Sequence, residues 1–150
     1  MQLFRRKGIM RVLTLLLGLL LVGCASDLEK ARKSAEKGDA VAQDKLGNMY
    51  SKGEGVPLDY KQAATWYSKA AEQGLASAQS NLAFMYYKGE GIAKDDVKAY
   101  AWLSLAAAQG KSKDAVGARD LVAMGLTPEQ LSQAQALAAE LQNKMSRKRP

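Results

Sequence analysis

Residues 39–74 read DAVAQDKLGNMYSKGEGVPLDYKQAATWYSKAAEQG, and residues 75–110 repeat that pattern as LASAQSNLAFMYYKGEGIAKDDVKAYAWLSLAAAQG. Eighteen of the 36 aligned positions are identical, including both Lys-Gly-Glu-Gly segments and both tryptophans. Unrelated helices of similar composition would not keep these features in register. The chain therefore contains two copies of one structural unit.

Each unit divides into two helices joined by a loop. In the first helix the apolar residues fall at the i, i+4, i+7 and i+8 positions of one helical face. They are Ala42, Leu46, Met49 and Tyr50, repeated as Ala78, Leu82, Met85 and Tyr86. The second helix keeps a helical spacing with Ala63, Trp66, Tyr67, Ala70 and Ala71, repeated as Ala99, Trp102, Leu103, Ala106 and Ala107. The loop glycines suit a helix stop with positive φ, and Asp59 and Asp95 are expected to cap the second helices.

Partial units are expected at both ends of the array. A capping box at residues 26–29 opens a helix that ends at Gly38, which in register is a second helix without its first. After Gly110 a degenerate unit begins, in which Leu121 takes the place of Met85. Its last helix starts with a Thr cap and presents Leu131, Ala134, Leu137, Ala138 and Leu141. Terminal units of this kind close the core of a stacked array.

The sequence therefore predicts an all-α solenoid of about seven short helices after an N-terminal signal. Its domain covers residues 24–143, with units at 39–74 and 75–110 and a degenerate capping unit at 111–143. The basic residues 144–150 are expected to form a disordered tail.

The repeated pattern resembles a known family. Its elements are Ala-x-x-Gly-x-Ala-x-Ala-Gln-x-x-Leu, Met-Tyr-x-x-Gly-x-Gly, Asp-x-x-x-Ala-x-x-Trp and Ala-Ala-x-x-Gly, and together they are similar to the Sel-one-like repeat, which is related to tetratricopeptide repeats. The resemblance covers residues 35 to about 110 and extends loosely to about 142. It implies an α-solenoid whose first helices line a concave face that binds proteins or peptides, and it implies no shared chemistry. Tyr67 becomes Leu103 and the third unit lacks the tryptophan, so the last unit is expected to be a cap.

The N-terminal residues have the layout of an export signal. A basic segment precedes the mostly apolar run 12–22, whose eleven residues fall short of the about 20 needed to span a bilayer. This run suits the apolar region of a secretory signal peptide. An uncleaved membrane anchor is the alternative.

Residues 21–24, Leu-Val-Gly-Cys, resemble the lipobox of bacterial lipoproteins. The resemblance implies cleavage between Gly23 and Cys24, a signal peptide over residues 1–23, and covalent lipid on Cys24. More than one acyl chain gives stable membrane attachment. By the same resemblance, Ala25 rather than Asp after the cysteine implies the outer membrane. We expect the domain to face the periplasm, and display on the cell surface is the alternative.

Charge and composition narrow the function further. The chain carries 22 Lys and Arg against 15 Asp and Glu, a formal charge of +7, but eight of the cations lie in the signal and in the last seven residues. Residues 24–143 are nearly neutral, so we expect no nucleic-acid partner. The chain has no histidine, and Cys24 is its only cysteine. This excludes Ser-His-Asp and Cys-His catalysis, histidine metal sites and an intramolecular disulfide. We expect no metal, and no cofactor other than the lipid on Cys24.

Candidate partner contacts lie where the two units differ on the less apolar side of the first helices. They are Lys45, Asn48, Asn81, Phe84 and Tyr87. Phe84 and Tyr87 are favoured because exposed aromatic side chains are costly and supply contact area. Solvated surface is an equally simple interpretation of these positions.

The candidates for acid–base chemistry are Glu54, Glu90 and Asp95. These acids recur with the repeat on loops and caps, which favours a structural role, and no catalytic residue is assigned. We therefore expect a lipid-anchored envelope protein that acts as a non-catalytic interaction module for an unidentified envelope protein or peptide. The alternatives are a peptidoglycan or glycan binder and, less favoured, a carboxylate-dependent hydrolase.

Overall fold

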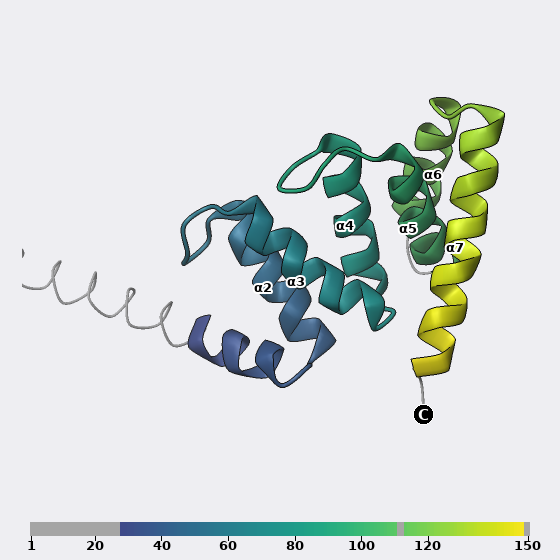
Figure 1. Cartoon of the computed structure of the whole chain (residues 1–150). Helices are drawn as coiled ribbons and strands as arrows, with labels where there is room; N and C mark the ends of the chain where they lie inside the picture. Colours follow the sequence, from purple (N-terminus) through teal and green to yellow (C-terminus); the bar gives the residue numbers. More distant parts are fainter. Residues whose placement is uncertain (1–27, 111–112, 149–150) are drawn as a thin grey trace, which may run out of the picture.

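The structure is a computed structural model that describes residues 28–110 and 113–148. Within these ranges the chain forms seven helices and no strand, stacked as antiparallel neighbours (Figure 1). The predicted all-α solenoid is confirmed. The predicted signal peptide, its cleavage site at Gly23 and Cys24, and the N-cap at Ser26 lie outside the described residues.

The helices alternate in direction along the solenoid. An N-terminal helix at residues 28–36 comes first. It is followed by α2 (Ala40–Lys52), α3 (Tyr60–Glu72), α4 (Ala76–Lys88), α5 (Asp96–Ala108), α6 (Lys113–Met124) and α7 (Pro128–Lys148). The helices α2 and α3 form the first unit and α4 and α5 the second, while α7, at 21 residues, is longer than the short helix predicted.

The predicted helix boundaries are confirmed by their caps. Gly53 ends α2 and Gly89 ends α4, each with a left-handed backbone, at φ 70° and 73°. The Asp59 carboxylate accepts hydrogen bonds from two backbone N–H groups at the start of α3. The Asp95 carboxylate does the same for one N–H of α5. These caps fix where each second helix begins relative to its loop.

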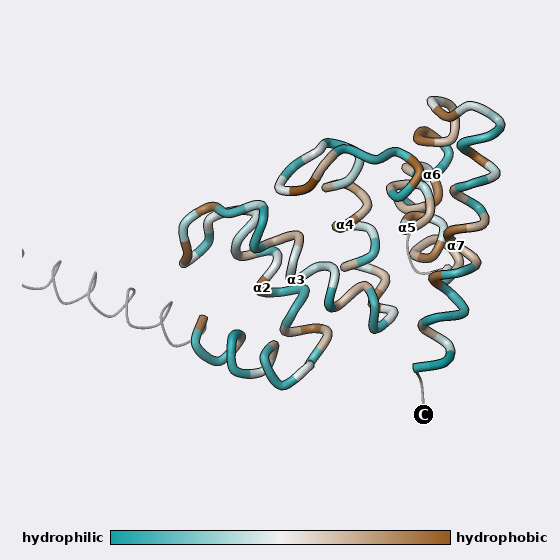
Figure 2. The backbone as a smooth tube through the Cα atoms, in the orientation of Figure 1, coloured by the Kyte–Doolittle hydropathy of each residue, from teal (hydrophilic) through white to brown (hydrophobic). Residues whose placement is uncertain are grey.

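The core lies between the helices and is centred on α5. This helix packs against α4, α6 and α7, and most of its residues are buried. Figure 2 shows the hydrophobic colouring concentrated toward α4, α5 and α6, whereas the C-terminal half of α7 is largely hydrophilic. Every residue of the main buried cluster lies between Ala63 and Met145, so a chain that starts at Cys24 contains the complete core.

The structure differs from the sequence prediction in the third unit. Leu121 occupies the place of Met85, which is 4% exposed, yet Leu121 itself is 70% exposed. The reason is the position of α7, which packs against α5 instead of pairing with α6 as α5 pairs with α4. With no second helix beside it, this face of α6 stays open to solvent.

The C-terminal end is also corrected. Residues 144–148, predicted to be part of a disordered tail, continue α7 through Lys148. Met145 is 7% exposed and its sulfur lies 3.6 Å from Gln79 Nε2, while Lys148 Nζ lies 3.2 Å from the Glu72 carboxylate on α3. Met145 follows Leu141 by four residues and so extends the apolar face by one turn. The basic residues around Met145 obscure this last apolar turn in the sequence, so the prediction ends the apolar face at Leu141.

Buried glutamines tie each unit to the helix before it. Gln79 is 1% exposed, and its Nε2 donates to the Ala71 carbonyl at the end of α3 at 3.3 Å. Gln109 Nε2 in turn donates to Gln79 Oε1 at 3.0 Å. In the first unit Gln43 donates to the Ala35 carbonyl and accepts from Gln73 in the same way. The repeat therefore conserves one polar contact between units as well as its apolar face.

Gln79→Leu should lower the free energy of unfolding by about 1.5 kcal/mol, because it leaves buried hydrogen-bonding groups without a partner. Denaturant unfolding of the purified chain measures the change. Gln62→Leu, at an exposed position of α3, is the matched control and should change stability by less than about 0.5 kcal/mol. Equal effects of the two substitutions would contradict the assigned role of Gln79.

Candidate partner-binding groove

A hollow lies on the side of the solenoid formed by the first helices of the units. It has a volume of about 470 Å³ and opens between α4 and the start of α6. Apolar atoms make up most of its wall, and serine, amide and carboxylate side chains contribute the rest. The lining residues are Leu75, Ala76, Ser77, Ser80, Asn81, Phe84, Gln109, Asp114 and Ala115.

The structure brings two of the five predicted contact residues into this groove. Asn81 and Phe84 line it, and Phe84 is 42% exposed. Tyr87 lies nearly one turn further along α4, is 47% exposed, and has Lys94 Nζ 5.4 Å above its ring. Lys45 is exposed on α2, outside the groove lining.

Asn48, the remaining candidate, is engaged within the fold. Its Nδ2 donates to the Asp44 carbonyl at 3.0 Å, and its Oδ1 accepts from the Tyr67 hydroxyl at 3.1 Å. Both polar atoms of its amide therefore have partners inside the first unit.

Asp44 links the two first helices beside the groove. Its Oδ2 accepts from the Ser77 hydroxyl at 2.8 Å, and its Oδ1 accepts from Asn81 Nδ2 at 3.1 Å. These bonds hold α2 against α4 and fix the Asn81 side chain. The repeat does not predict this link, because Asp44 aligns with Ser80 and the second unit therefore has no matching carboxylate.

The differences between the units follow from one aromatic ring. In the first unit the Tyr67 ring is 3% exposed and packs over Gly47, where a β-carbon would lie 2.6 Å from ring atoms. The Tyr67 hydroxyl hydrogen-bonds to Asn48 and to Ser51 Oγ, at 3.1 Å each. Burial raises the pKa of Tyr67, so the phenol stays protonated and donates.

In the second unit Leu103 replaces this tyrosine and Ala83 replaces the glycine beneath it. Leucine has no hydroxyl, so the positions that hold Asn48 and Ser51 in the first unit no longer need polar side chains. They hold Phe84 and Tyr87, which are both exposed. Among the residues that the structure describes, the exposed aromatic side chains therefore lie in the second unit for a structural reason.

The acids considered for catalysis have local partners. Glu54 lies 4.0 Å from Lys52 and Glu90 lies 3.8 Å from Lys88, in equivalent loops. Asp95 caps α5 and pairs with Lys98 at 3.2 Å. Over the described ranges, no group of three or more acidic or cysteine side chains is placed to hold a metal ion. No helix within those ranges has the length and apolar character needed to cross a membrane.

Comparison with known proteins agrees with this geometry. The model of the Sel1 repeat family matches residues 40–75 and 76–111. One similar solved structure is the crystal structure of c5321, a protective antigen present in uropathogenic Escherichia coli strains that displays an SLR fold. Its sequence is 38% identical to this chain and its TM-score is 0.75, and the match covers 80% of this chain and 27% of that one. A Sel1 repeat protein from Oxalobacter formigenes is 40% identical with a TM-score of 0.56, over 58% of this chain and 25% of that one.

This chain thus spans about a quarter of the length of either solved structure. A comparison with curated proteins found no match. The two matched repeats follow each other directly with the 36-residue period found in the sequence, and the solved structures share the same helical fold. The chain therefore contains two consecutive Sel1 repeats in an α-solenoid fold that is typically a protein–protein interaction module.

Proposed function

We propose that this chain is a lipid-anchored envelope protein whose solenoid binds a protein or peptide partner in the groove between α4 and α6, without catalysing a reaction. The observation that carries the proposal is Phe84, a large apolar side chain left 42% exposed in the wall of a 470 Å³ hollow. Exposed aromatic side chains in a concave apolar surface are typical of binding sites.

The groove sets the chemistry of its occupant. Leu75, Phe84 and Ala115 offer apolar contact, and Asp114 adds a carboxylate at the start of α6. A short helix or extended segment that inserts an apolar side chain and presents a donor or a cation toward Asp114 matches this lining. With two complete repeats, the groove accommodates one such segment.

A photoreactive amino acid at position 84 tests this proposal in intact cells. The expected result is a discrete crosslinked partner at position 84 and none at Thr65, an exposed control position on α3. Phe84→Ala with Tyr87→Ala should then weaken binding of the purified partner at least tenfold, since interface aromatics of this kind contribute about 2 kcal/mol. Unchanged affinity with intact helicity would exclude the groove as the binding site.

The membrane attachment is supported by residues 21–24 and the apolar run before them. Lipid on Cys24 would hold the solenoid at the envelope, on the outer membrane facing the periplasm. Metabolic labelling with a fatty-acid analogue should mark the wild-type chain and not the Cys24→Ser variant. Label that survives in the variant would exclude the anchor and leave the groove unaffected.

A glycan-binding role is the second candidate, and the exposed pair Phe84 and Tyr87 supports it because aromatic rings stack on sugars. Retention on purified peptidoglycan, lost in Phe84→Ala with Tyr87→Ala, would favour it over a protein partner. A hydrolase has weaker support, since Glu54 is exposed, Glu90 is half-buried, and each is paired with a neighbouring lysine. A hydrolytic activity that Glu90→Gln abolishes without unfolding the protein would support the hydrolase alternative.

A further inference from the structure

The solenoid has two edges of different construction. One edge holds the long loops at residues 53–59 and 89–95, which lie along the upper side of the molecule (Figure 1). The other holds the short turns at residues 37–39 and 73–75 together with the C-terminal end of α7, along the lower side. The N-terminal helix also lies on this lower side.

The long-loop edge is electrically balanced. Lys52 pairs with Glu54 and Lys88 with Glu90 in the two equivalent loops. Lys94 and Lys98 also pair with carboxylates, at 3.5 Å and 3.2 Å. Four of the five described lysines that flank these loops therefore have a carboxylate within 4.0 Å, and Lys61 is the exception.

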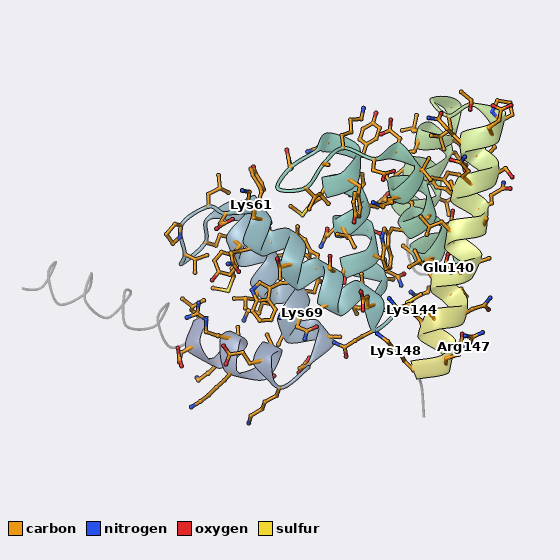
Figure 3. The ribbon with its side chains drawn as sticks, viewed as in Figure 1. Lys61, Lys69, Glu140, Lys144, Arg147 and Lys148 are labelled. Atoms are coloured by element: carbon orange, nitrogen blue, oxygen red, sulfur yellow. The ribbon has the colours of Figure 1, made fainter. Side chains whose placement is uncertain are left out.

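The short-turn edge carries an excess of cations, which we call the basic edge: Lys33, Lys37, Lys69, Lys144, Arg147 and Lys148. Among the described residues, Lys148 is the one member with a carboxylate within 4.0 Å, that of Glu72. The other acids of this edge are Glu36, Asp39 and Glu140, and Asp39 is engaged in capping α2. Figure 3 shows Lys69, Lys144, Arg147 and Lys148 near this edge, at the ends of α3 and α7.

The end of α7 also offers a shallow hollow of about 430 Å³. Its lining consists of Glu140, Asn143, Lys144, Arg147 and Lys148, so three cations and one amide face one carboxylate. Cations at a helix C-terminus interact favourably with the helix dipole, and the N-terminal helix, α3 and α7 all end at this edge. The partial charge of about −0.5 at a helix end is too small, however, to balance the three cations at the end of α7.

We infer that the basic edge lies against an anionic lipid surface and orients the solenoid on the membrane. The inference rests on the proposed lipid at Cys24, four residues before the first described helical residue. Four extended residues span at most about 14 Å, so the lipid would be held close to the N-terminal helix on the same lower side. Lipid phosphates then supply the counter-charges that the basic edge lacks, and the long loops point away from the bilayer.

Vesicle binding by the unacylated chain tests the inference separately from the anchor. The protein used starts at residue 24, carries Cys24→Ser and contains the whole core. It should sediment with vesicles containing phosphatidylglycerol, not with vesicles of phosphatidylcholine alone, and be released by high salt. Equal binding to both vesicles, or binding to a duplex oligonucleotide in preference to them, would overturn the inference.

Charge-removal variants locate the contact. Lys37→Gln, Lys144→Gln and Arg147→Gln together should weaken binding about 100-fold, since each cation near an anionic surface contributes roughly fivefold. The matched control removes the same charge from the other edge, with Lys52→Gln and Lys88→Gln combined with Lys94→Gln. Equal losses for the two triple variants would show a general charge effect and overturn the assignment to the basic edge.

A single labelling site reports the orientation directly, because Cys24 is the only cysteine of the chain. In the Cys24→Ser background, an environment-sensitive dye on Asn143→Cys should shift to the blue when phosphatidylglycerol vesicles are added. The same dye on Leu58→Cys, at the long-loop edge, should not shift. The reverse pattern of dye shifts would overturn the orientation. If the wild-type chain took up no fatty-acid label but the dyes behaved as expected, only the proposed lipid anchor would be excluded.

Discussion

Gly91→Ala should destabilise the protein by about 3 kcal/mol. Gly91 has φ +72°, and a left-handed backbone costs an ordinary L residue about 1–2 kcal/mol. A β-carbon at this position would also overlap the Tyr60 carbonyl and lie 2.7 Å from the Lys61 nitrogen. Backbone atoms cannot move aside as a flexible side chain can, so the loop of the second unit would have to lift off the start of α3.

The first unit supplies a matched control for this substitution. Gly55 occupies the equivalent loop position with φ +73°, but the nearest atom to its β-carbon is the flexible end of Met49, at 3.5 Å. Gly55→Ala should therefore cost only the conformational term of about 1–2 kcal/mol. Guanidinium unfolding of both variants measures the difference. Equal losses would show that the contact between Gly91 and Tyr60 does not contribute to the stacking of the units.

Gly47→Ala should destabilise the protein by about 1–2 kcal/mol, although alanine is favoured over glycine within a helix by about 0.5–1 kcal/mol. The added methyl group would lie 2.6 Å from two atoms of the buried Tyr67 ring. Ring displacement would also disturb the hydroxyl bonds to Asn48 and Ser51. The steric cost is larger than the gain in helix propensity, so the substitution should lower the free energy of unfolding although alanine is the better helix former.

A double-mutant cycle with Tyr67→Leu tests this explanation. The double variant recreates the Ala83 and Leu103 pair of the second unit, so Gly47→Ala should become neutral or stabilising in that background. We expect a coupling energy of about 2 kcal/mol from thermal or denaturant unfolding of the four proteins. Strictly additive effects would mean that the two positions differ between the units independently.

Local rules were enough to predict much of the fold. The 36-residue period, the helical faces and the caps at Asp59 and Asp95 depend on residues close in sequence, and the structure confirms them. Hydrophobic spacing also predicted a last helix, but it could not show that α7 would pack on α5. The sequence therefore predicts Leu121 in the core and a disordered tail at residues 144–150, whereas Leu121 is exposed and α7 continues through Lys148.

The groove was predicted less completely, for a related reason. Asn81 and Phe84 were identified as positions where the two units differ, and the structure places them in one hollow. A difference between repeats does not say whether a side chain faces solvent or a neighbouring helix. Asn48 also differs between the units, yet its side chain accepts a hydrogen bond from Tyr67, nineteen residues away. Contacts across helices of this kind require the packed structure.

The packing of α7 on α5 also determines at which position an additional repeat can be inserted into the solenoid. The buried Ala101 and Leu105 of α5 take the places of the exposed Thr65 and Lys69 on α3, so only α5 has an apolar outer side for α7 to cover. A copy of residues 39–74 inserted after Gly74 would lengthen the solenoid and leave this pair intact. The same copy inserted after Gly110 would place threonine and lysine under α7. Elongation by duplication is therefore possible on the N-terminal side of α4 and blocked beyond α5.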